Sequence, residues 1–238
     1  MDEQASTLLS VRGDAEQMVP PDYAVLGCQI ETGATTKAES LRAAAAVQQQ
    51  LITALTELGG RPLTADTGRL PLTWAARAST TQPEHDYDEQ TGRHGPTGRV
   101  LTNVSLSIVV RAFDLLDRLD SALARIEQFR IYVVTWGVDA DNPAWPQVRA
   151  AAIHAALQKG SDYAFALGGS LRSIEHLADT GLLGGADSSS GGVRSSRAFA
   201  MASAVPAPDT PSLDPEPQQL VASIEARFLA TIAPLAQR

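Results

Sequence analysis

The densest group of side chains able to bind a metal ion lies between residues 84 and 94. Glu84, His85, Asp86 and Asp88 stand close together, and His94 follows them. Carboxylates and imidazoles bind divalent ions, so these five residues are the candidate metal ligands. Their spacing matches no zinc or calcium template. A solvated acidic loop is therefore the alternative interpretation.

Three other residues could take part in catalysis. Cys28 lies on the apolar side of an expected strand, which favours inert packing over a reactive thiol. His154 lies in an alanine-rich helix and His176 in an expected strand, and neither has a serine or cysteine nucleophile in a characteristic turn beside it. The serine- and glycine-rich stretch at 188–192 lacks the lysine and the strand–loop–helix setting of a phosphate loop. We expect no catalytic residue and no cofactor, and hence no enzyme.

Composition narrows the class of protein. The 238-residue chain has a formal net charge of −8, and this charge removes the main attraction to nucleic acid. It has a single cysteine, so an intrachain disulfide is excluded. Neither a signal-peptide pattern nor the roughly 20 apolar residues of a membrane span is present. A cytoplasmic location is expected, and a cell-envelope location would follow if a leader had been removed.

Hydrophobic periodicity predicts the elements that position these residues. The pattern predicts strands at 8–15, 23–31, 61–67, 72–79, 100–111, 129–136, 170–179 and 219–230, and helices at 36–58, 114–126 and 146–167. The first two strands form a candidate hairpin around Pro20-Pro21. Residues 80–98 are expected to be a polar loop, and 182–217 a flexible segment rich in glycine, serine and proline.

This order of elements, β-β-α-β-β followed by β-α-β-α-β-β, predicts an α/β (α+β) fold. We expect a mixed, largely antiparallel sheet with two long alanine-rich helices and one shorter helix packed on it. Because the last strand must return to the sheet, residues 1–238 are predicted to form a single domain.

Several short motifs, in order, resemble those of the SIMPL-domain family. They are Val11-Arg12-Gly13-Asp14-Ala15, Val19-Pro20-Pro21-Asp22-Tyr23-Ala24, Leu58-Gly59, the helix from Ala151 to Leu167-Gly168, and the strand that follows Pro215. The resemblance covers nearly the whole chain. Three features depart from the family pattern: the signal-peptide pattern of many members is not seen, Gly160 stands where alanine is usual, and the 80–98 loop looks specific to this chain.

The resemblance implies a bacterial protein with an envelope-associated or stress-related role and no agreed biochemical activity. Long alternating strands at both chain ends leave sheet edges that need protection or a partner. We therefore expect a non-enzymatic interaction protein that forms a homo-oligomer. A small-molecule or metal-binding protein using the 84–94 loop is the alternative.

Overall fold

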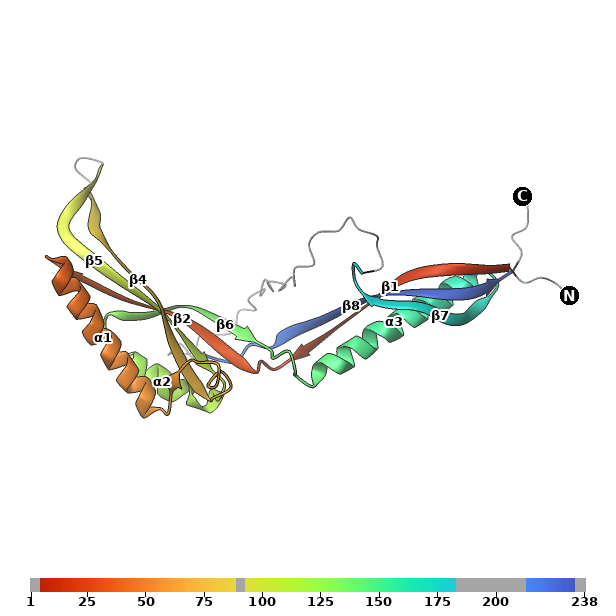
Figure 1. The fold of residues 1–238 in the computed structure, drawn as a ribbon, viewed down its shortest axis with the longest axis horizontal. Helices are drawn as coiled ribbons and strands as arrows, with labels where there is room; N and C mark the ends of the chain where they lie inside the picture. Colours follow the sequence, from red (N-terminus) through yellow and green to blue (C-terminus); the bar gives the residue numbers. More distant parts are fainter. Residues whose placement is uncertain (1–4, 89–92, 183–212, 234–238) are drawn as a thin grey trace, which may run out of the picture. The chain divides into compact units, whose positions relative to one another are not determined.

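The protein is described by a computed structural model, in which residues 5–88, 93–182 and 213–233 are placed well enough to describe (Figure 1). The strands are β1 (Ala5–Val19), β2 (Tyr23–Ala34), β3 (Arg61–Pro62), β4 (Leu72–Asp88), β5 (Arg93–Val110), β6 (Phe129–Gly137), β7 (Ser170–Asp179) and β8 (Gln218–Ile232). The helices are α1 (Lys37–Glu57), the 3-10 turn η1 (Phe113–Leu115), α2 (Leu116–Leu123) and α3 (Ala144–Ala166). The predicted α/β class and the predicted order of elements are confirmed.

The described strands form two sheets, where one was expected. The first has the order β1-β8-β7 and is antiparallel throughout. The second has the order β3-β4-β5-β2-β6, in which only the short β3–β4 pair is parallel. Each sheet belongs to its own compact unit. We call these the three-stranded unit (β1, α3, β7, β8) and the five-stranded unit (β2 to β6 with α1 and α2).

The predicted hairpin between the first two strands is wrong. β1 pairs with β8, from Ala5 opposite Ile232 to Val19 opposite Gln218, whereas β2 lies between β5 and β6 in the other sheet. Period-two alternation indicates which side chains share a face of a strand, but it does not identify the neighbouring strand. The neighbour of β1 is instead β8, the last strand of the chain.

The expected polar loop at 80–98 is also corrected, because both strands run into it. β4 continues to Asp88 and β5 begins at Arg93. Thr80 and Thr81 pair with Asn103 and Thr102 of β5, and β-branched threonine suits a strand even where the surface is polar. Pro83 is accommodated at a shift in register, where a missing N–H is tolerated.

Helix α1 begins and ends as its sequence predicts. Thr36 accepts a hydrogen bond from the Glu39 backbone N–H, while the Glu39 carboxylate accepts one from Thr36. This reciprocal capping box satisfies two donors that the first helical turn leaves unpaired. Gly59 follows the helix with a φ of 85°, a conformation that glycine adopts without strain.

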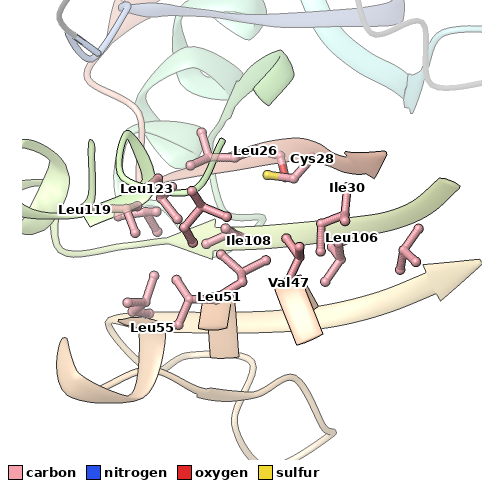
Figure 2. Packing of buried hydrophobic residues seen from close by; sticks show 14 of the residues in the cluster. Leu26, Cys28, Ile30, Val47, Leu51, Leu55, Leu106, Ile108, Leu119 and Leu123 are labelled. Atoms are coloured by element: carbon pink, nitrogen blue, oxygen red, sulfur yellow. The ribbon is translucent and has the colours of Figure 1, made fainter. Parts of the chain in front are cut away.

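The five-stranded unit has its core between the sheet and helices α1 and α2. The apolar side of β2, on which Cys28 was expected, faces this core: Ala24, Leu26, Cys28 and Ile30 have no exposed surface. Figure 2 shows Leu26, Cys28 and Ile30 of β2 among apolar side chains from α1, α2 and β5. Leu213, described just after the undescribed 183–212 stretch, packs against the same core. The predicted flexibility of 182–217 lies mostly outside the described residues.

The three-stranded unit is built on close contact between α3 and the sheet (Figure 1). One small residue per helical turn is buried against the strands: Ala152, Ala156, Gly160 and Ala164. Gly13 of β1 lies directly under this row, because a Cβ there would meet the backbone N of Ala156 at 2.6 Å. Small side chains on both sides thus bring the helix and sheet together.

Candidate interaction surface

The candidate metal ligands lie along the outer part of the β4–β5 hairpin. Glu84, His85 and Asp86 are consecutive on β4, at a shift in its register with β5. The His85 Nδ1 lies 3.2 Å from the Pro83 carbonyl oxygen. The Glu84 carboxylate accepts a 2.7 Å hydrogen bond from Thr97 and lies 3.6 Å from the Arg99 guanidinium. These contacts give Glu84 a structural role in the hairpin.

The other two candidates, Asp88 and His94, are placed only by their backbones. They lie in β4 and β5 near the hairpin end, where Tyr87 pairs with His94, and their side chains lie outside the described residues. Among the residues that are described, no group of three histidine, cysteine or carboxylate side chains could hold a metal ion. The five-residue metal site remains a prediction.

Cys28 and the two singled-out histidines occupy contrasting environments. Burial in the five-stranded core raises the pKa of the Cys28 thiol to about 12, so it stays protonated and unreactive in the folded protein. His154 is exposed on α3, with Nδ1 2.8 Å from the Ala150 carbonyl oxygen of its own helix. His176 is exposed on β7. The structure brings none of the three together with another.

An open groove separates α1 from α2. Its volume is about 630 Å³, and it is lined by alanines, polar residues and one isoleucine from the two helices and the turn after α2: Ala46, Gln49, Gln50, Thr53, Ala54, Glu57, Ala122, Arg125 and Ile126. Its charged lining consists of one carboxylate, Glu57, and one guanidinium, Arg125, and a guanidinium has no hydrogen-bond acceptor. This combination offers no general acid–base pair.

The most unusual surface of the three-stranded unit is the side of β7 that faces α3. Leu171, Ile174 and Leu177 pair with Ala230, Phe228 and Ala226 of β8. Directly paired residues share a face of the sheet, and these three β8 residues are buried beneath α3. Sequence patterning correctly identified the apolar members of β7, and their face is the one toward the helix.

Although this face of β7 points to the helix side, α3 does not cover it. The helix packs mainly on β1 and β8, so Ile174 remains 50% exposed and Leu177 45% exposed. Leu157 of α3 is 38% exposed and lies one helical turn before Gly160, where an added Cβ would lie 3.4 Å from Cδ1 of Leu171. We call the surface formed by Leu157, Leu171, Ile174 and Leu177 the α3–β7 strip.

A charged cluster at one end of the five-stranded unit was not predicted. The Arg111 guanidinium donates two hydrogen bonds to Asp139, of 2.7 and 3.1 Å, and a third to the Gly68 carbonyl oxygen. The hydrogen bond and positive charge from Arg111 lower the pKa of the Asp139 carboxyl below its ordinary value, with a smaller contribution from Arg69. No local motif marks this cluster, because its members are far apart in the sequence.

Comparisons with known proteins agree with the family resemblance seen in the sequence, and they assign no biochemical activity to the chain. No helix among the described residues is long and apolar enough to cross a membrane. A search of curated proteins finds no match. The model of one protein family, described as "SIMPL: Protein of unknown function (DUF541)", matches residues 9–228. Because this match covers almost the whole chain and includes both units, the chain belongs to the SIMPL family.

Proposed function

We propose that this SIMPL-family chain is a non-enzymatic interaction protein that self-associates through the α3–β7 strip. The observation that carries the proposal is the row of apolar β7 side chains that the helix of its own unit leaves half exposed. Contiguous exposed apolar surface of this kind is typical of protein interaction sites. β7 pairs with β8 on one side only in the described sheet, so a partner can approach along its other edge.

Charge supports a second copy of the chain as the occupant. Arg172 and Glu175 lie three residues apart, exposed, at the two register shifts of β7. A second copy running antiparallel across a two-fold axis would bring each arginine toward the glutamate of the other copy. Such an interface uses the same patch on both copies, as most homodimers do.

We expect the α3–β7 strip to give a modest affinity between two copies of the chain. Burying an exposed leucine or isoleucine contributes ~1.5–3 kcal/mol, and the strip residues are already about half buried. Association also costs several kcal/mol in lost translational and rotational freedom. We therefore expect an assembly whose molar mass rises with protein concentration.

Size-exclusion chromatography with light scattering, over a concentration series, tests the proposal. The wild-type chain should associate, and the double variant Ile174→Ser/Leu177→Ser should remain monomeric. Leu8→Ser/Val221→Ser is the matched control. It removes two exposed apolar side chains from the opposite face of the same sheet, so it should associate like the wild type.

A charge swap tests the partner and the orientation. Arg172→Glu should weaken association, because two like charges would face each other across the interface. Arg172→Glu/Glu175→Arg should restore it. A wild-type chain that is monomeric at every concentration would overturn the proposal, and equal loss in the control variant would reject the strip as the interface.

A further inference from the structure

The chain passes between the two units at three described points. These are the bonds from Val19 to Pro20, from Asp139 to Ala140 and from Glu216 to Pro217. Hydrogen bonds, an ion pair and apolar packing hold the ends of these connections. In the three-stranded unit the first and third connections are held together, because Val19 of β1 pairs with Gln218 of β8. The contacts that hold the first and second connections lie in the five-stranded unit.

The first two connections are fastened to each other. The Asp22 backbone N–H donates to the Gly137 carbonyl oxygen at 2.8 Å. In return, the Asp139 backbone N–H donates to the Asp22 carboxylate at 2.8 Å. Each connection thus begins beside the other, held by two hydrogen bonds just before the chain leaves the unit.

Arg111, the residue that follows β5, secures this pair. Its two terminal nitrogens bind both Asp139 oxygens, and its guanidinium lies 4.9 Å from the centre of the Tyr23 ring. Only 19% of the Arg111 side chain and 16% of the Asp139 side chain are exposed. A bidentate ion pair that is this well shielded from water is stronger and more directional than a surface pair.

The cluster is separate from the core that holds the five-stranded unit together. The core consists of apolar side chains from β2, β4, β5, α1 and α2, and it contains none of the three charged residues. The third connection is held differently, because Leu213 packs against that core three residues before the crossing. Within the five-stranded unit, the third connection therefore has an anchor in the apolar core, whereas the first two meet at the charged cluster.

We propose that Asp22, Arg111 and Asp139 form a clasp, a conformational device that holds the first two connections together and limits the motion of one unit against the other. Closed, the clasp holds the two connections side by side where they leave the five-stranded unit. Open, the second connection is no longer tied to the first, and the distance between the units takes a wider range of values. This inference is independent of self-association.

Pulsed electron–electron resonance on the full chain measures that range. Spin labels are placed at the exposed positions by Arg42→Cys on α1 and His154→Cys on α3. Buried Cys28 is left in place. An excess of unlabelled protein removes distances between copies. The distance distribution should broaden in Arg111→Met and keep its width in Arg125→Met, which removes an exposed arginine from the same unit.

A second variant, Asp22→Ala, tests the clasp even if Arg111→Met does not fold. Asp22→Ala removes the acceptor of the Asp139 backbone N–H and leaves the Arg111–Asp139 pair in place. It should broaden the distribution and speed hydrogen exchange of the Asp139 amide by at least about tenfold, as expected for losing a hydrogen bond to a charged group. Unchanged distances in Asp22→Ala, or in folded Arg111→Met, would overturn the clasp.

Discussion

Cys28 shows how burial decides the chemistry of a single residue. Its side chain is fully buried between the sheet and the helices of the five-stranded unit, and its thiol faces the Leu26 carbonyl oxygen at 3.5 Å. Sequence patterning placed it on the inward face of its strand by simple alternation. The structure adds the consequence, which is a pKa raised from 9.0 to about 12.

This raised pKa predicts a loss of stability at high pH. The unfolded thiol releases its proton near pH 9 and the folded one near pH 12. The thiol's contribution is therefore complete below pH 9 and is lost as pH rises through this window. The free energy of unfolding should fall there with a slope approaching about 1.4 kcal/mol per pH unit.

Denaturant titrations of the wild type and of Cys28→Ala, across the same pH values, isolate this effect. Lysines and tyrosines also titrate in this range, but they are common to both proteins. Only the difference between the two slopes belongs to the thiol. Rapid alkylation of Cys28 in the folded protein at neutral pH would contradict the burial on which the prediction rests.

At the scale of elements, α3 shows a conflict between helix propensity and packing. From its sequence alone, Gly160 lowers the stability of the helix by roughly 1 kcal/mol relative to alanine. In the structure, a Cβ at this position would lie 3.0 Å from Cδ2 of Phe228, which is buried in β8. Glycine therefore allows α3 to lie close to the sheet.

Gly160→Ala should consequently fail to stabilise the protein. Crowding against the buried Phe228 ring should cost ~1–3 kcal/mol, enough to cancel or exceed the gain in helix propensity. In a Phe228→Leu background, where the ring is gone, the same substitution should stabilise by up to about 1 kcal/mol. The unfolding free energies of the wild type, Gly160→Ala, Phe228→Leu and the double variant complete this double-mutant cycle. A full gain in the wild-type background would contradict the packing argument.

At the scale of the whole molecule, the sequence predicts a single domain and the structure contains two compact units. The hydrophobic core around Leu51 includes only residues of the five-stranded unit. Phe228 is buried with the alanines of β8 and α3 in the three-stranded unit. That the two units have separate cores does not decide whether they unfold in one step or in two.

We expect the units to unfold separately. Phe228→Ala should cost ~3–5 kcal/mol and speed hydrogen exchange in β7 and β8, while Cys28 stays protected from alkylation. Leu51→Ala is the matched variant in the other core, and it should expose Cys28 first. If both variants expose Cys28 equally, the chain unfolds as one cooperative domain, as the single-domain prediction requires.

The sequence by itself determined most of the local structure. The capping box at Thr36 and Glu39, the inward face from Ala24 to Ile30 and the fold class depend on short-range chemistry and hydrophobic alternation, which neighbouring residues specify. The missed features need distant partners. The clasp joins Asp22, Arg111 and Asp139, and β1 finds β8 at the other end of the chain.

Only the tertiary structure decided which strands are neighbours and which apolar faces stay uncovered. Ile174 and Leu177 look like core residues in the sequence, yet they are about half exposed because α3 lies over β1 and β8. A periodic pattern identifies which side of a strand is apolar. What covers that side depends on the packing of the whole unit, because burial is a property of the assembled chain and not of any segment within it.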